Sequence, residues 1–251
     1  MAEASGTPSN VEGKTSGLTE AASSQGPGLF RPVASYWHLL AVLIAQGALA
    51  YRGRALTLQL HGAALDRVAL YQRTMLLEWL LLGLVLAGVW WQESSVFSVL
   101  GERWRSPGRF FRDFGIGLAF LMVPIVMGSI AGSLLGHGND AAARRILPQG
   151  GVETWYWVAL SISAGICEEA IYRGYLQRQF MALTRNVPAG ILFSATLFGA
   201  AHSYQGVRLA VQIGILGALS GMLAYWCKSV RPGMIAHILQ DLMGGLAHSH
   251  G

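Results

Sequence analysis

Apolar runs of bilayer-spanning length recur from residue 33 onward, and they limit the possible folds more than any other feature. A helix needs roughly 17 to 25 mostly apolar residues to cross a bilayer. Charged residues make up only 12% of the chain, about half of the roughly 25% found in soluble proteins. The sequence therefore predicts an all-α, polytopic membrane helix bundle. The seven predicted spans are Val33–Tyr51, Thr74–Trp91, Phe114–Gly136, a run from Thr154 that continues past Cys167, Val187–Tyr204, Leu209–Cys227 and Pro232–His248.

A further element is expected between the first two spans, at Ala55–Tyr71. Apolar residues there are mixed with His61, Asp66 and Arg67. This mixture favours an amphipathic helix at the membrane surface, although an eighth span is the alternative. The expected bundle therefore has seven or eight transmembrane helices.

The basic residues predict the orientation of the chain. With seven spans, the loops on the N-terminal side hold 11 Lys and Arg residues, and the opposite loops hold 7. Because basic loops tend to stay in the cytoplasm, we expect a multi-pass protein of the inner (plasma) membrane with a cytoplasmic N-terminus. The basic residues are scattered rather than clustered, which argues against a nucleic-acid partner. Residues 1–30 are rich in Ser, Gly and Thr and predict a disordered cytoplasmic tail.

Ionisable residues inside apolar spans are candidates for function, because inserting each one costs roughly 2.5 kcal/mol or more. Glu78 stands near the start of its span, where we expect it to reach the interface or to pair with Arg73. Glu168 and Glu169 are adjacent in ICEEAIYRGYL. Residues four apart share a helix face, so Glu169 is expected to pair with Arg173. Glu168 has no such local cation and is the carboxylate available for chemistry.

Two later spans carry polar side chains at the same four-residue spacing. Phe198 and His202 share one face, and His237 and Asp241 share another. Counting helical rise from the span ends places Glu168, His237 and Asp241 in the cytoplasmic half of the bilayer. We therefore expect the polar faces of three helices to converge there.

These motifs resemble those of the CAAX-protease and bacteriocin-processing (CPBP, or Abi) family of glutamic-type intramembrane proteases. EEAIYR is similar to its EExxxR motif, FGAAH to FxxxH, and HILQD to the third motif, HxxxN or HxxxD. The resemblance covers about residues 150 to 245. It implies a helical bundle with a polar cavity open to the cytoplasm, which hydrolyses a peptide bond near the C-terminus or a membrane segment of a substrate. We therefore divide the chain into N-terminal transmembrane helices at 31–150, which carry no recognised family motif, and a catalytic core at 151–248.

The resemblance implies a role for each residue of the predicted catalytic site. Amide hydrolysis needs an activated water, a proton for the leaving amine and donors for the oxyanion. The candidate site residues are Glu168 as general base with His202, His237 and Asp241 on the oxyanion side, and Glu169 and Arg173 as the orienting pair.

We expect no cofactor, since no HExxH motif is present. Zinc held by Glu and His side chains is the alternative.

Two other function classes fit a membrane bundle with these residues. A scaffold or immunity protein would keep the fold without cleaving, and a transporter would use Glu168, Glu169 and Asp241 as a proton relay. The expected partners are the lipid bilayer and a membrane-associated protein or peptide substrate. Prenylated proteins, peptide pheromones or bacteriocins and C-terminal sorting signals all suit the family. The preference for Arg over Lys is typical of a GC-rich bacterium, where sorting or maturation fits better than prenyl processing.

Overall fold

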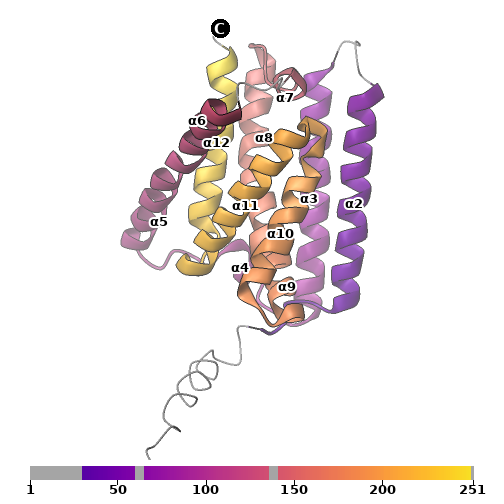
Figure 1. The fold of residues 1–251 in the computed structure, drawn as a ribbon. Helices are drawn as coiled ribbons and strands as arrows, with labels where there is room; N and C mark the ends of the chain where they lie inside the picture. Colours follow the sequence, from indigo (N-terminus) through magenta and orange to yellow (C-terminus); the bar gives the residue numbers. More distant parts are fainter. Residues whose placement is uncertain (1–29, 60–64, 136–140, 250–251) are drawn as a thin grey trace, which may run out of the picture.

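The computed structural model describes residues 30–59, 65–135 and 141–249. These residues form a bundle of long helices with short helical connections and no strand (Figure 1). The all-helical class predicted from the apolar runs is confirmed. The long helices are α2 (Tyr36–Gln59), α3 (Arg67–Trp91), α5 (Pro107–Phe120), α6 (Met122–Leu135), α8 (Val152–Glu168), α10 (Val187–Ala201), α11 (Val207–Cys227) and α12 (Arg231–Ser249). The short ones are α4 (Phe97–Leu100), α7 (Ala141–Arg145), the π-helix η1 (Glu169–Leu176), α9 (Gln177–Thr184) and the 3₁₀ turn η2 (Ser203–Gln205).

Within the described residues, each of the seven predicted spans falls largely on one long helix or on two consecutive helical elements. Among the described residues, three helical segments are long and apolar enough to cross a membrane, namely Arg67–Trp91, Pro107–Ile130 and Val207–Cys227. Val187–Ala201 is a shorter apolar helix. The chain is thus a membrane protein of several spans, and the count of seven stays a prediction.

The prediction of an amphipathic helix at Ala55–Tyr71 is wrong for the part of that stretch that the structure describes. Ala55 lies in the last turns of α2, and Tyr71 lies in the second turn of α3. The polar residues have other roles, because Asp66 caps α3 by accepting from the Ala69 amide at 2.9 Å. Arg67 reaches the last residue of α7, where its Nε donates to the Arg145 carbonyl at 2.9 Å. Residues 60–64, with His61, and the tail at 1–29 lie outside the described residues.

Helix α8 occupies the middle of the bundle, packed against α3 on one side and α12 on the other (Figure 1). Glycines allow these helices to approach closely. A Cβ on Gly165 would lie 2.4 Å from a side-chain carbon of Ile238, and one on Gly245 would lie 2.0 Å from the Trp157 indole nitrogen. Helix α10 packs on α11 in the same way, since a Cβ on Gly199 would lie 2.5 Å from the Ala210 carbonyl oxygen. This close packing holds α12 against α8 and α11 against α10.

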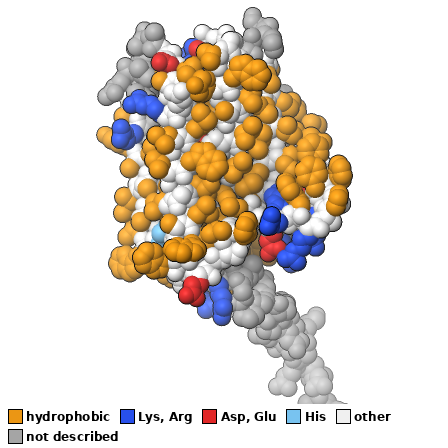
Figure 2. Space-filling model, turned by 180° about the vertical axis from the view of Figure 1, so that it is seen from behind, with side chains coloured by type: hydrophobic (Ala, Val, Ile, Leu, Met, Phe, Trp, Pro, Cys, Tyr) orange, Lys and Arg blue, Asp and Glu red, His pale blue; other side chains and the backbone are white. Residues whose placement is uncertain are grey.

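Large apolar side chains cover the outside of the bundle, as Figure 2 shows for one face. Trp37, Trp91 and Trp155 are 82%, 84% and 75% exposed. Such exposure would be unfavourable in water and is expected where lipid is the solvent, with Trp enriched at the membrane interface. The polar groups that matter for chemistry therefore lie inside the bundle.

Candidate active site

The first motif lies where α8 changes from an α-helix into the π-helix η1. Glu168 is the last residue of α8 and Glu169 the first of η1. The wider helix is visible in the backbone, since the Gln177 amide at its end donates to the Tyr172 carbonyl, five residues earlier. All eight residues of η1 are buried. Short π-segments are rare and occur frequently at functional sites.

Glu169 and Arg173 form the ion pair that their spacing predicts. Arg173 Nη1 lies 3.1 Å from Glu169 Oε1, and both side chains are almost completely buried, with 3% and 2% exposure. Ser220 on α11 donates to the other Glu169 oxygen at 3.0 Å. On α12, Gly233 leaves space for this carboxylate, because a Cβ there would lie 2.7 Å from Glu169 Oε2.

Arg173 is itself held between two helices. Its guanidinium carbon lies 4.3 Å above the centre of the Phe198 ring on α10, a cation–π contact. Its Nη2 donates to the Gly217 carbonyl on α11 at 3.3 Å. The pair therefore ties η1 to α10 and α11, which fixes the carboxylate that follows Glu168.

Glu168 faces the two histidines of the later motifs. Its Oε1 lies 3.9 Å from His202 Nε2, and its Oε2 lies 3.6 Å from His237 Nε2. Oε2 is buried and accepts no hydrogen bond from the described residues. Glu168 is thus close to two imidazoles but is not tightly bonded to either of them, in contrast to Glu169.

The orientation of His202 follows from one hydrogen bond. Its Nδ1 lies 2.8 Å from the Phe198 carbonyl oxygen, and a carbonyl can only accept, so Nδ1 carries the proton. In the neutral ring Nε2 is then an acceptor, and this is the nitrogen that faces Glu168. Two acceptors therefore face each other across 3.9 Å.

His237 is surrounded by carboxyl groups. Its Nδ1 lies 3.5 Å from Glu169 Oε1, and its Nε2 lies 3.6 Å from Asp241 Oδ2 as well as from Glu168 Oε2. Because carboxylates accept, this arrangement favours a ring that donates from both nitrogens. Trp157 on α8 donates to the Asp241 backbone carbonyl at 2.9 Å, which fixes this turn of α12 against α8.

The structure brings all six predicted site residues together, but it corrects the interpretation of Glu78. Glu78 was expected to reach the interface or to pair with Arg73. Instead, its Oε2 accepts a hydrogen bond from Ser163 on α8 at 2.9 Å, and it lines the same cavities as Glu168. The reason is geometric, because α3 packs on α8 and turns Glu78 toward the inside of the bundle.

Sequence reasoning also missed several polar neighbours. Gln46 on α2 donates to the Tyr172 hydroxyl, although these residues are 126 positions apart. Tyr204 stacks on His202 with ring centres 6.1 Å apart. Ser220 was the easiest to detect, since it is a polar residue in the apolar, glycine-rich run GALSG. The other contacts depend on long-range packing and have no local signal.

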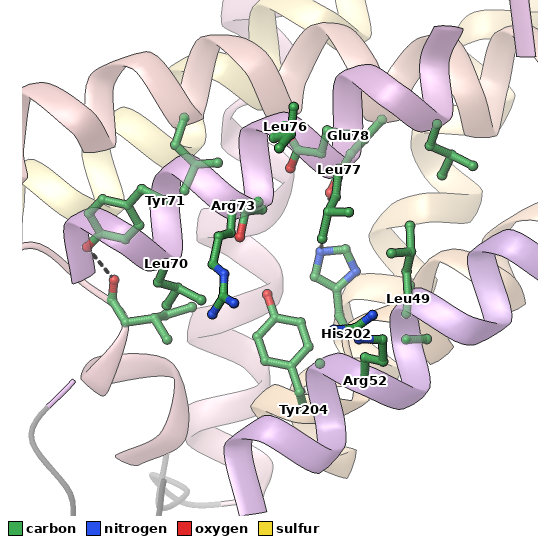
Figure 3. A pocket seen from close by; sticks show the side chains of 18 of the residues that line it. Leu49, Arg52, Leu70, Tyr71, Arg73, Leu76, Leu77, Glu78, His202 and Tyr204 are labelled. Atoms are coloured by element: carbon green, nitrogen blue, oxygen red, sulfur yellow. Dashed lines mark hydrogen bonds and ion pairs between the residues drawn. The ribbon is translucent and has the colours of Figure 1, made fainter. Parts of the chain in front are cut away.

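Two cavities meet at these residues. The larger, of about 840 Å³, is mostly apolar and lies between α2 and α3, and Figure 3 shows Arg52, Arg73, Glu78 and His202 around it. The smaller cavity, of about 520 Å³, is lined by all six predicted site residues among others. Because Glu78, Glu168 and His202 line both cavities, they stand where the two join.

The larger cavity lies toward the end of the bundle opposite Phe30. Most of its lining residues come from the second half of α2 and the first half of α3, including the exposed side chains of Arg52 and Arg73, and α8 and η1 supply part of the rest. Figure 1 shows these halves far from the point where the chain enters α2. We expected both a cytoplasmic N-terminus and a cavity open to the cytoplasm. With a cytoplasmic N-terminus, the larger cavity lies toward the opposite side of the membrane; with the larger cavity toward the cytoplasm, the N-terminus lies on the opposite side.

The described residues offer no group of three or more His, Cys, Asp or Glu side chains arranged to hold a metal ion. The donor set at this site consists of carboxyl groups and imidazoles that face one another at 3.5 to 3.9 Å.

Comparison with known protein families agrees with the three motifs. The model of the Type II CAAX prenyl endopeptidase Rce1-like family matches residues 150–243. This family belongs to the CPBP family, so the resemblance is confirmed for this part of the chain, which includes all six site residues. Comparisons with curated proteins and with solved structures give no match.

Proposed function

We propose that this chain, whose residues 150–243 carry the Rce1-like domain of the CPBP family, is an intramembrane endopeptidase with Glu168 as its general base. The family match supports a protease acting on membrane-associated substrates in a lipid bilayer. The geometry of the site supports the roles of the individual residues.

The observation that carries this proposal is the pair of acceptors formed by Glu168 and His202. Their facing atoms are 3.9 Å apart, too far for a hydrogen bond between them. One water molecule can donate its two hydrogens to both atoms and turn its lone pairs toward a substrate carbonyl. Glu168 then takes one proton of this water as it attacks. Protonated Glu168 afterwards returns the proton to the leaving nitrogen.

His237 lies on the other side of Glu168, where it is suited to bind the oxyanion. A ring that donates from both nitrogens is positively charged and stabilises the negative oxygen of the tetrahedral intermediate. Asp241, 3.6 Å from His237 Nε2, orients this ring rather than facing the oxyanion as a carboxylate. Glu169 orients the other nitrogen, and Arg173 keeps Glu169 in place.

The substrate is proposed to be a peptide segment that lies in the mostly apolar cavity and reaches the polar one. We keep the orientation that the basic residues predict, with the N-terminus in the cytoplasm of a bacterial inner membrane. Arg52 and Arg73 then lie toward the outer side, where membrane-anchored sorting signals of surface proteins are accessible. Cysteines introduced in turn at Gln92, near the N-terminal end of the bundle, and at Arg52 test this orientation by labelling with a membrane-impermeant reagent.

The experiment that tests the proposed function compares protein N-termini and C-termini in membranes of cells that carry the wild-type chain, no chain, or Glu168→Gln. Glu93→Gln serves as the matched control, because it removes an exposed carboxylate outside both cavities. We expect new termini with the wild type and the control only. Identical termini in all four strains would favour a scaffold, and proton-coupled flux in liposomes would favour a transporter.

A further inference from the structure

Tyr204 is a polar residue beside the candidate active site that the mechanism above does not use. It lies in the 3₁₀ turn η2, two residues after His202 of the FGAAH motif. Its ring stacks on the His202 ring, with the ring centres 6.1 Å apart and the planes tilted by 27°. Because His202 faces Glu168 across 3.9 Å, this direct contact places Tyr204 next to the proposed water site.

The turn that carries Tyr204 forms part of the wall of the larger cavity. η2 packs against α2 and α7 as well as against α11. Tyr204 lines both cavities, together with Glu168 and His202. Figure 3 shows its ring beside His202, with the hydroxyl oxygen pointing into the larger cavity. The hydroxyl group therefore faces the space proposed for the substrate, close to the bond that Glu168 attacks.

The Tyr204 hydroxyl group has a proton to donate. Gln205 Nε2 donates to its oxygen at 3.0 Å, and this bond uses a lone pair of the oxygen rather than its hydrogen. Within the described residues, no group accepts a hydrogen bond from Tyr204. Tyr71, which also lines the larger cavity, differs because its hydroxyl donates to the Ile146 carbonyl at 2.6 Å. The Tyr204 hydroxyl is thus a donor that is free to bind a ligand in the cavity.

A peptide that enters this cavity needs such a donor. Transferring a backbone carbonyl group from water into apolar surroundings costs free energy unless the group finds a hydrogen-bond donor there. The larger cavity is mostly apolar, so it can satisfy few carbonyl groups of a peptide segment. A free hydroxyl beside His202 therefore fixes where along the segment a carbonyl group is best placed.

We propose that Tyr204 donates a hydrogen bond to a main-chain carbonyl of the substrate that lies close to the cleaved bond but is not part of it. This inference rests on the proposed function. The oxyanion that forms from the scissile carbonyl is bound by His237, which lines the smaller cavity and not the larger one. Tyr204 therefore positions the peptide and takes no part in bond breaking. Its hydrogen bond is equally strong before and during the reaction, so it lowers KM without raising kcat.

The test removes the hydroxyl group and its acceptor separately and together. The probe is a lipid-anchored fluorogenic peptide with the cleaved sequence found by the comparison of termini. In a set of analogues, each main-chain carbonyl near the cleaved bond, apart from the scissile one, is replaced in turn by a thiocarbonyl, which accepts hydrogen bonds weakly. Purified wild type, Tyr204→Phe and Tyr156→Phe are assayed with each peptide. Tyr156→Phe is the matched control, because the Tyr156 hydroxyl accepts from Gln72 at 2.9 Å outside both cavities.

We expect Tyr204→Phe to raise KM for the unmodified peptide about threefold to tenfold, the usual effect of losing one hydrogen bond. Its kcat should stay close to that of wild type, because the Phe ring still stacks on His202. One thioamide analogue should show a similar rise in KM with wild type and no further rise with Tyr204→Phe. Tyr156→Phe should match wild type on every peptide. KM does not depend on the fraction of folded protein, so a partial loss of the fold does not imitate this result.

Three results would overturn the role of Tyr204. They are an unchanged KM, a fall in kcat as large as the rise in KM, and a rise in KM on replacing Tyr204 that is the same for every analogue. A wild type that does not cleave the unmodified peptide would instead refute the proposed function itself.

Discussion

The buried pair of Glu169 and Arg173 makes a strong prediction about stability. Arg173→Ala removes the arginine that pairs with Glu169 at 3.1 Å and leaves a carboxylate that is 2% exposed, with His237 at 3.5 Å as its remaining ion-pair partner. Breaking a buried pair in this way typically costs about 3 to 5 kcal/mol. For a chain of this size each kcal/mol lowers the melting temperature by about 2 to 4 °C, so we expect a decrease on the order of 10 °C.

The assay is thermal unfolding in detergent, followed together with peptidase activity. Arg105→Ala is the matched control, because Arg105 pairs with Glu102 at 3.7 Å on the surface and both side chains are more than two-thirds exposed. Exposed pairs contribute little, so the control should melt close to wild type. An Arg173→Ala protein that melts within 2 °C of wild type, roughly half a kcal/mol, would refute the structural role of the pair.

Two further predictions concern α12. Asp241→Asn should keep substantial activity, because an amide can still hold His237, whereas Asp241→Ala should lose activity. Strong chelators should not inhibit the wild-type protein. Chelator-sensitive activity that zinc restores, together with an inactive Asn variant, would instead make His202, His237 and Asp241 metal ligands. Gly233→Ala should lower melting temperature and activity, since overpacking typically costs about 1 to 3 kcal/mol and its Cβ would lie 2.7 Å from Glu169 Oε2. Gly244→Ala on the same helix meets nothing within 4 Å and should behave as wild type in both assays, and similar behaviour of the two variants would contradict the packing of Glu169.

The local pairs of the site could be predicted from spacing, because each pair lies on a single helix. Glu169 and Arg173 are four residues apart, as are His237 and Asp241, and both pairs lie on one helix face in the structure. The apolar runs likewise located the long helices, since hydropathy depends only on local sequence.

Other features depend on contacts that sequence spacing does not contain. The π-helix at η1 was not foreseen, because residues four apart stay near one another in both helix types. The partner of Glu78 was assigned to the nearest cation, Arg73, although Ser163, 85 residues away, is the actual hydrogen-bond donor. The polar residues Asp66 and Arg67 were interpreted as an amphipathic face, although Asp66 caps α3 and Arg67 binds the last residue of α7.

The most direct test of the account is the turnover of purified Glu168→Gln in detergent or liposomes with a fluorogenic peptide that contains the cleaved sequence found by the comparison of termini. The change removes the base but keeps the size of the side chain, so the melting temperature should stay close to that of wild type. We predict that a folded Glu168→Gln protein shows no measurable cleavage while Glu93→Gln cleaves at the wild-type rate. Turnover by the folded Glu168→Gln protein that is comparable to wild type would contradict the assignment of Glu168 as the general base.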